Sequence, residues 1–163
     1  MFDSFLHNNS SEVYVMFTVK SAMLEVCPVT FQIPAGFQLL QTREEFIDPT
    51  LFLLAPENLC TVALSLSRSQ RPSKEELLDI FSEGGYMLLS PVEPIVCGAL
   101  SGHCAAYLSG KYGYWEVRLD IPSVSDGDYS TLVIQLSSHQ YTSLTTLRNH
   151  PSIHFLLNSI ALS

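Results

Sequence analysis

The chain has 163 residues, of which 47% are hydrophobic and 15% charged. This composition excludes a disordered chain and fits one domain with a real core. Acidic residues outnumber basic ones by 16 to 8, and the net charge of −8 argues against binding to nucleic acids or to anionic membranes. The charge is compatible with a basic protein partner.

The N-terminus shows no export signal, because the segment from Met1 to His7 has no basic start and no apolar stretch with a cleavage site follows it. No run of residues is long and apolar enough to span a bilayer. The four cysteines, Cys27, Cys60, Cys97 and Cys104, are scattered along the chain and are predicted to be reduced core residues. We therefore expect a cytoplasmic protein without membrane insertion.

The first third of the chain predicts extended segments separated by bends. Residues 1–12 are polar, and we expect them to fray. Strongly β-prone residues cover Val13 to Val19, and a second extended run covers Val29 to Ile33. The Pro34–Gly36 segment predicts a bend, since proline fixes φ and glycine frees it. The polar stretch from Gln38 to Pro49 predicts a loop or a single helical turn.

Two short runs joined by a turn predict an antiparallel hairpin. The runs are Leu51 to Ala55 and Cys60 to Ser67, and the turn is Pro56–Asn58. The second run alternates apolar with small or polar residues, and alternate residues of a strand point to opposite faces. One face of this hairpin is therefore expected to lie on the core.

A helical pattern follows. The Ser-x-x-Glu spacing of Ser73 and Glu76 is typical of a capping box, in which the serine oxygen accepts a hydrogen bond from the glutamate amide. Apolar residues at helical spacing run from Leu77 to Phe81. Gly84-Gly85 suits a left-handed cap, so the pattern predicts a helix over about 73–83.

The clearest β pattern follows this helix. Ile95–Cys97 predicts a short strand, and Gly98–Gly102 predicts a turn. His103–Leu108 and Tyr114–Ile121 both alternate apolar with polar or smaller residues, and Ser109–Gly113 between them contains two glycines. These features predict a long antiparallel hairpin.

The C-terminal part predicts one more strand and a second principal helix. Thr131–Ser137 alternates in the manner of a half-buried strand. Pro151 suits the first position of a helix over about 151–161, with an apolar stripe from Ile153 to Ile160. The whole chain, residues 1–163, is therefore predicted to be a single α+β domain with a mainly antiparallel sheet flanked by two principal helices.

This order of elements resembles the PsbP-like superfamily, which includes Mog-like and DcrB-type domains. The Phe31–Phe37 stretch (FQIPAGF) is similar to the opening of those domains. The resemblance continues with the Ser73–Phe81 helix, the Val96–Asp120 strand and hairpin, and a closing helix that contains Asn158-Ser159-Ile160. It covers about residues 29–162, through structural positions rather than catalytic ones.

The resemblance implies a binding or assembly module without a shared catalytic residue set. No functional residue is therefore carried over from the family to this chain. Two features depart from it: exported members have a leader or a lipidated cysteine, which is not visible here, and the N-terminal β segment is longer than the family implies.

Candidate chemical groups are few. Cys97, His103 and Cys104 lack the paired Cys-x-x-Cys spacing of structural zinc sites, so no metal is expected. Cys97 and His103 could meet across the Gly98–Gly102 turn as a nucleophile and its base, although no third residue marks an orienting partner. No phosphate loop, nucleophile elbow or dinucleotide fingerprint occurs, and no cofactor is expected.

Aromatic residues of the central hairpin are the predicted binding site. Tyr107 and Tyr114 fall on the face opposite Trp115, Tyr112 lies in the predicted hairpin loop, and Arg118 shares the polar face. Exposed tyrosines anchor many protein interfaces. The alternative is that helices cover this face and that the tyrosines are half-buried core residues.

These observations favour a non-enzymatic protein-binding or assembly module of a PsbP-like type. Two alternatives remain: a small acidic chaperone of the kind that serves secretion, which would form a homo-oligomer, and a thiol-dependent enzyme that uses Cys97 and His103. The binding hypothesis rests on Tyr107, Tyr112, Tyr114 and Arg118.

Overall fold

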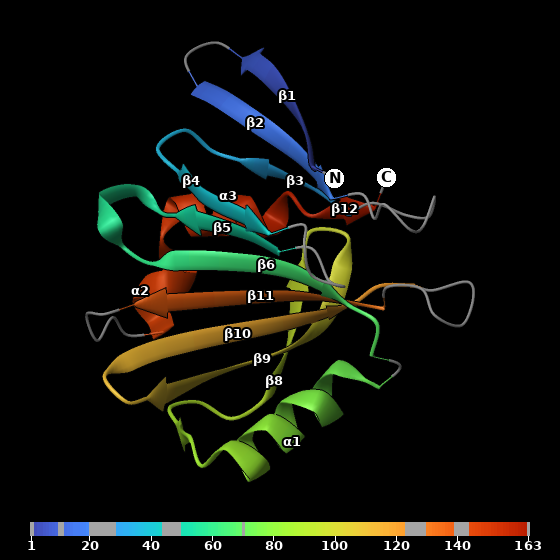
Figure 1. Ribbon diagram of the computed structural model, residues 1–163, viewed down its shortest axis with the longest axis vertical. Helices are drawn as coiled ribbons and strands as arrows, with labels where there is room; N and C mark the ends of the chain where they lie inside the picture. Colours follow the sequence, from blue (N-terminus) through green and yellow to red (C-terminus); the bar gives the residue numbers. More distant parts are fainter. Residues whose placement is uncertain are drawn as a thin grey trace.

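The computed structural model describes residues 2–9, 12–19, 29–43, 50–69, 71–122, 130–138 and 144–162. In these ranges the chain forms two sheets and three α-helices (Figure 1). Every strand pairing among them is antiparallel. The predicted α+β class with a mainly antiparallel sheet is confirmed.

The larger sheet has eight strands in the order β4-β5-β6-β11-β10-β9-β7, and β8 also pairs with β9. Its strands are β4 (Gln38–Arg43), β5 (Thr50–Leu54), β6 (Thr61–Ser67), β7 (Met87–Leu88), β8 (Glu93–Cys97), β9 (Leu100–Ser109), β10 (Tyr112–Asp120) and β11 (Thr131–Ser138). The smaller sheet has the order β1-β2-β3-β12, with β1 (Phe2–Asn9), β2 (Glu12–Val19), β3 (Val29–Ile33) and β12 (Ala161–Leu162). The helices are α1 (Ser73–Gly84), α2 (Leu144–Asn149) and α3 (Pro151–Asn158), with a 3₁₀ turn η1 (Pro56–Asn58).

The core lies on one face of the larger sheet, beneath α3 and β3. Inward residues of four strands stand in register across this face: Leu64, Ile134, Val117 and Cys104. They belong to one buried cluster with Phe31 of β3 and the apolar stripe of α3. Helix α1 lies against the opposite face, along β9 and β10 (Figure 1).

Most predicted elements are confirmed. Strands occur at Val13–Val19, Val29–Ile33 and Thr131–Ser137, and both predicted hairpins form as β5–β6 and β9–β10. Helix α1 ends at Gly84 and is capped by Gly85, whose φ of 65° is left-handed. Pro151 opens α3, which ends at Asn158 rather than near residue 161 because Ala161 already pairs with Thr30 of β3.

Two polar segments form strands that the sequence pattern did not predict. The loop expected at Gln38–Pro49 is wrong for its first half, since β4 pairs there with β5; residues 44–49 lie outside the described ranges. Residues 1–12, expected to fray, contain β1, which pairs with β2 from Phe2 opposite Val19 to Asn9 opposite Glu12. Edge strands need little apolar alternation, because backbone hydrogen bonds to one neighbour hold them.

The turn expected over Gly98–Gly102 is also shorter than predicted. Only Gly98 and Ala99 form it, and β9 begins at Leu100. Gly102 lies inside the strand opposite Leu119, where a Cβ atom would collide with the Arg118 carbonyl oxygen. This glycine therefore serves a close approach of two backbones rather than a turn. Helix α2 and the two-residue strands β7 and β12 were not predicted either.

Candidate functional site

A row of four tyrosines crosses the sheet face on which α1 lies. Tyr107 of β9 stands opposite Tyr114 of β10, and their rings stack with centroids 5.1 Å apart. Tyr86 lies 5.0 Å from the Tyr107 ring, and Tyr112 lies 6.4 Å from the Tyr114 ring. We call Tyr86, Tyr107, Tyr114 and Tyr112 the tyrosine row. Its spacing is typical of mutually stabilising aromatic pairs.

Tyr107 is the buried member of the tyrosine row. It is only 4% exposed, and the Phe81 ring of α1 covers it edge-on at 5.2 Å. Its hydroxyl accepts a hydrogen bond of 3.0 Å from the Gln135 amide. Burial, together with the nearby Glu116 carboxylate, raises the pKa of Tyr107 well above its usual range, so the phenol stays protonated. Tyr112 and Tyr114 keep partial exposure and form the accessible part.

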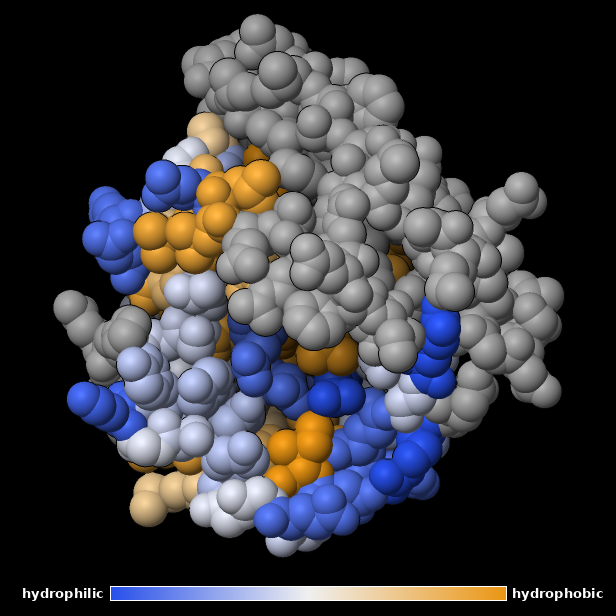
Figure 2. All heavy atoms as spheres, viewed as in Figure 1, coloured by the Kyte–Doolittle hydropathy of each residue, from blue (hydrophilic) through white to orange (hydrophobic). Residues whose placement is uncertain are grey.

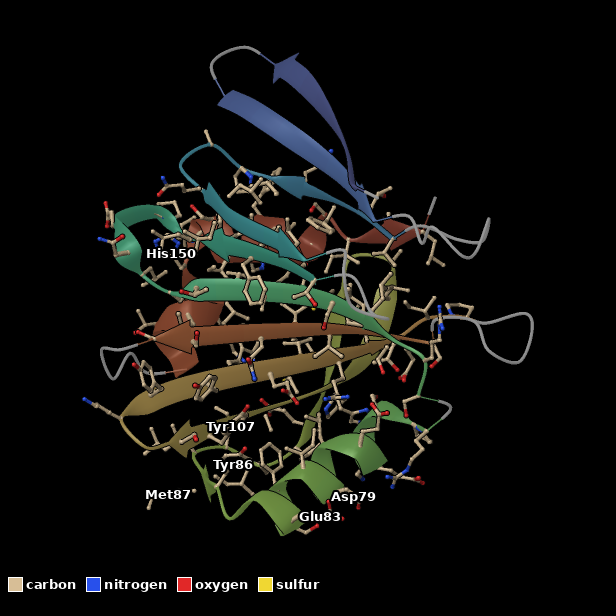
Figure 3. All side chains as sticks on the ribbon, viewed as in Figure 1. Asp79, Glu83, Tyr86, Met87, Tyr107 and His150 are labelled. Atoms are coloured by element: carbon tan, nitrogen blue, oxygen red, sulfur yellow. The ribbon has the colours of Figure 1, made fainter. Side chains whose placement is uncertain are left out.

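An exposed apolar segment, Tyr86–Leu89, adjoins the tyrosine row and shares Tyr86 with it. We call this segment the apolar edge. Met87 is 65% exposed, and Leu88 and Leu89 are exposed as well. Figure 3 shows Tyr86 next to Tyr107, with Met87 pointing away from the sheet. Figure 2 shows this face largely hydrophilic around α1, with a hydrophobic protrusion at the lower left, where Met87 lies.

The backbone of the apolar edge is firmly held. Leu88 pairs with Tyr107 in the β7–β9 ladder, and the Leu89 amide donates to the Ala106 carbonyl at 2.8 Å. The Ser90 hydroxyl accepts from the Ala106 amide at 2.9 Å. The apolar side chains are therefore presented on a fixed strand. A run of four exposed apolar residues is a defect in a protein surface unless a partner uses it.

Acidic side chains follow one face of α1. Glu75, Asp79 and Glu83 occur at four-residue intervals on this helix, and Figure 3 shows Asp79 and Glu83 on its side facing away from the sheet. Asp79 forms an exposed ion pair with Arg71. Glu83 lies in the last turn of α1, where the helix dipole disfavours negative charge.

Arg118, a predicted binding residue, is held below the surface. Its Nη1 donates to Glu76 of α1 at 2.7 Å and its Nε donates to Glu116 at 3.1 Å. Both carboxylates are buried, and the Arg118 side chain is 15% exposed. The Gln135 amide also contacts Glu116 at 3.3 Å. Arg118 therefore fastens α1 to the sheet, and Tyr112 and Tyr114 are left as the accessible residues of the predicted set.

The predicted capping box is wrong, because Ser73 turns toward the sheet. Its hydroxyl donates to Asp120 at 3.0 Å and its amide donates to the same carboxylate at 3.3 Å. The Glu76 amide donates to the Pro72 carbonyl instead, so α1 begins one residue earlier than the motif implies. A helix start can be satisfied from the tertiary structure as well as from its own side chains.

Ser73, His103 and Asp120 have the residue types of a hydrolytic triad but not its geometry. In a triad the histidine lies between the serine and the acid. Here Ser73 lies between them, 2.9 Å from His103 Nδ1 and 3.0 Å from Asp120. Since its one hydroxyl proton goes to Asp120, His103 Nδ1 must donate to Ser73. Ser73 is 1% exposed, and the trio joins α1 to β9 and β10.

The thiol hypothesis gains no support from the geometry. Cys97 pairs with Leu100 and faces the core, whereas His103 points to the opposite face and contacts Ser73. Burial raises the pKa values of Cys97 and Cys60 to about 12 and also raises that of Cys104. Cys27 lies outside the described residues. The described cysteines are thus free, buried and protonated.

Alkylation tests this conclusion. At about pH 8 a thiol with a pKa of about 12 holds about one part in ten thousand of its population as thiolate. We expect iodoacetamide to leave Cys97 unmodified in the folded protein over hours and to modify it within minutes in urea, as followed by peptide mass spectrometry. Cys60 serves as the internal control. Rapid modification of Cys97 in the folded protein, while Cys60 stays protected, would support the thiol-enzyme hypothesis.

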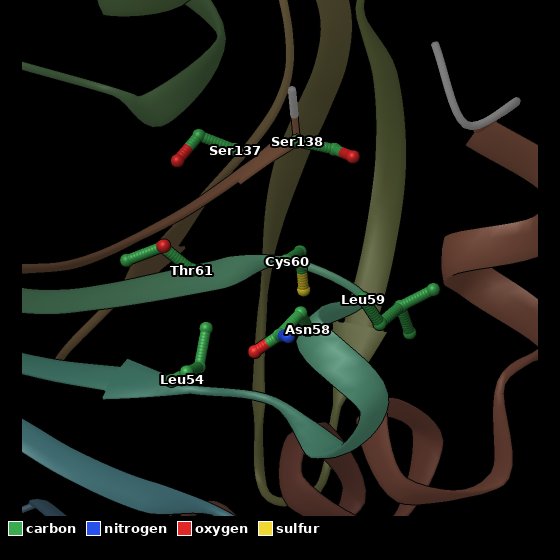
Figure 4. A pocket seen from close by; sticks show the side chains of 7 residues that line it. All are labelled: Leu54, Asn58, Leu59, Cys60, Thr61, Ser137 and Ser138. Atoms are coloured by element: carbon green, nitrogen blue, oxygen red, sulfur yellow. The ribbon is translucent and has the colours of Figure 1, made fainter. Parts of the chain in front are cut away.

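A pocket of about 370 Å³ lies between η1 and the end of β11. Figure 4 shows Ser137 and Ser138 pointing to opposite sides of their strand, and the Cys60 sulfur pointing toward Asn58. These polar groups do not converge on one point, as a nucleophile and its base must. The pocket therefore offers no catalytic arrangement.

No family model, no curated protein and no solved structure matches this chain. A membrane-crossing helix needs about 20 apolar residues, and no described helix meets that requirement. The function is therefore argued from the geometry of the tyrosine row and the apolar edge. Sequence reasoning named Tyr107, Tyr112 and Tyr114 of the row but missed Tyr86 and the rest of the apolar edge. Tyr112, expected in the hairpin loop, is the first residue of β10 and pairs with Ser109.

Proposed function

We propose that this chain is a non-enzymatic protein-binding module of a PsbP-like type, which binds an extended, basic segment of a partner protein along the apolar edge and the tyrosine row. One observation carries the proposal: Tyr86–Leu89 expose four large apolar side chains while their backbone is pinned to β9. A prepared apolar surface of this kind binds without first paying the entropy of ordering a loop.

The tyrosine row supplies anchors beside the edge. Tyrosine is enriched among residues that dominate binding energy, because its ring buries a large area and its hydroxyl keeps a polar contact. Tyr112 and Tyr114 are partly exposed, and the buried Tyr107 ring fixes Tyr114 by stacking. A partner side chain would therefore meet rigid rings.

Charge argues for a basic partner. The chain carries a net charge of −8, and Glu83 precedes Tyr86, the first residue of the apolar edge, by three residues in the chain. Complementary charge speeds encounter and suppresses unsuitable partners more than it adds affinity. A segment with lysine or arginine on either side of one or two large apolar residues fits this surface.

The order of elements supports the PsbP-like part of the proposal. Helix α1 follows the β5–β6 hairpin, the β8–β10 strands and β11 come next, and α3 closes the chain. The additional strands β1 and β2 extend the smaller sheet beyond that pattern.

Peptide selection tests the proposal directly. We expect random 12-residue peptides selected on the protein to be enriched in lysine or arginine with large apolar residues. The selected peptides should bind Met87→Ser/Leu89→Ser and Tyr112→Ala/Tyr114→Ala about tenfold or more weakly, as measured by fluorescence anisotropy. Glu83→Gln should weaken binding less and reduce its salt dependence.

Leu40→Ser is the matched control. Leu40 is exposed to a similar degree on β4, at the opposite edge of the same sheet, so its replacement should leave peptide binding unchanged. Thermal unfolding should show that each variant remains folded. Selection of acidic peptides, or equal weakening by Leu40→Ser and by Met87→Ser/Leu89→Ser, would refute the proposed surface.

A further inference from the structure

A second pocket, of about 330 Å³, lies on the core side of the larger sheet, away from the tyrosine row. Strand β8 contributes Glu93 and Ile95, β10 contributes Trp115, and the helices contribute Arg148 and Leu157. Its volume is at the lower end of the range for small-molecule sites, and it combines apolar walls with a few polar groups, as such sites do.

Arg148 is the central polar group of this pocket. Its guanidinium carbon lies 5.1 Å from the centroid of the Trp115 ring, within the range of a cation–π contact. Its Nη2 forms an ion pair with Glu93 and contacts the Cys104 sulfur at 2.9 Å. Among the described residues, its buried Nε finds no hydrogen-bond acceptor.

Trp115 carries a second buried donor. The side chain is 2% exposed, and its indole N–H lies against the Cys104 sulfur. A buried N–H group without an acceptor, such as Arg148 Nε, is rare in folded proteins. Asn149, His154 and Asn158 add further polar groups to the pocket lining.

We propose that this pocket binds a small free organic monocarboxylate. Its oxygens replace the Glu93 carboxylate on the Arg148 guanidinium, which matches a carboxylate in shape and charge. Its apolar part packs against Ile95, Leu157 and the Trp115 ring. Glu93 is 37% exposed, so its side chain leaves for water without burying a charge. This site is independent of the proposed peptide-binding surface.

Trp115 is the only tryptophan in the chain, so a change in tryptophan emission can be assigned to the surroundings of this one side chain. Sodium hexanoate is a transparent probe, and hexanamide has the same shape without the charge. We expect hexanoate to change the Trp115 emission in a saturable way, and hexanamide to bind about tenfold or more weakly. No saturable change, or equal binding of the amide, would overturn the proposal.

Two variants with opposite expected effects separate binding from a structural role. Arg148→Gln should weaken hexanoate binding about tenfold or more, whereas Glu93→Gln should tighten it, because the competing carboxylate is gone while the guanidinium remains. If the ion pair were only structural, both variants would lower stability and neither would tighten binding.

The Glu93→Gln result decides the matter even if Arg148→Gln fails to fold. Weaker hexanoate binding by Glu93→Gln would contradict the proposal that the ligand carboxylate replaces Glu93 on Arg148. Tyr112→Ala/Tyr114→Ala should bind hexanoate as the unmodified chain does, so a failure of the peptide-binding proposal leaves this test intact.

Discussion

Arg118→Leu is expected to lower the free energy of unfolding by about 3 kcal/mol or more, because it leaves Glu76 and Glu116 buried without their cation. Removal of one member of a buried ion pair commonly costs about 3–5 kcal/mol, and the 15% exposure of Arg118 places this case toward the lower end. Urea denaturation followed by circular dichroism measures the loss.

Arg71→Leu is the matched control for Arg118→Leu. Arg71 pairs with Asp79 of α1, but both side chains are about half exposed, so its replacement should leave the free energy of unfolding nearly unchanged. The triple variant Glu76→Gln/Glu116→Gln/Arg118→Leu should recover part of the stability, since it removes the stranded charges. Equal losses of unfolding free energy from Arg71→Leu and Arg118→Leu would show that burial of the Arg118 ion pairs does not increase their contribution to stability.

Gly102→Ala is expected to destabilise the protein by about 2–3 kcal/mol, the upper part of the range of about 1–3 kcal/mol for overpacking of a close-packed interior. Its Cβ atom would collide with the Arg118 carbonyl oxygen and approach the Leu119 Cα atom. Both are backbone atoms of β10, so the strand itself must shift. Thermal and urea unfolding of the variant would measure the loss.

Gly113→Ala provides the comparison on the partner strand. Gly113 pairs with Leu108 in the same ladder, yet a Cβ atom there meets nothing within 4 Å. Its replacement should be neutral or slightly stabilising, because alanine reduces the freedom of the unfolded chain. A Gly102→Ala variant as stable as Gly113→Ala would mean that the two strands can move apart freely.

Local patterns predicted those parts of the fold that depend on strand alternation. The period of two placed Tyr107 and Tyr114 on one face, and the glycine-containing turn joined their strands. Their direct pairing was not predicted, because the strands continue to Ser109 and Tyr112 and leave a shorter turn than the expected Ser109–Gly113 loop. The same reasoning predicted the apolar face that meets α3. These features are set by neighbours within one hairpin.

The burial of the opposite face, which carries Tyr107 and Arg118, could not be predicted in the same way. Whether Tyr107 and Arg118 are exposed depends on where α1 docks, and this is decided by Glu76, which lies 42 residues from Arg118 in the chain. The capping motif at Ser73 was misleading because Asp120, 47 residues away, offers its side chain a different partner. Contacts at such separations leave no periodic mark in the sequence.

The Arg148 pocket shows the same limit. Glu93 and Arg148 are 55 residues apart, and the helix that carries Arg148 is only six residues long in a polar segment. The apolar edge was missed for another reason: a run without alternation has no inward or outward face until its neighbours are known.

The way α1 is attached has a consequence for the motions of the protein. Leu77 is its only fully buried apolar side chain, and the buried core cluster contains no residue of α1. Its other anchors are the Phe81 ring on Tyr107 and two polar contacts, Arg118 with Glu76 and Asp120 with Ser73. Detachment of α1 would therefore expose Leu77, Phe81 and Tyr107 and leave the core closed.

An opening of this kind carries a small change in heat capacity and depends weakly on denaturant, because both quantities scale with the surface that becomes exposed. Salt, which screens ionic contacts, would shift it more than urea does. We therefore expect α1 to open separately from the core, with a release that uncovers Tyr107 while the rest of the sheet remains folded.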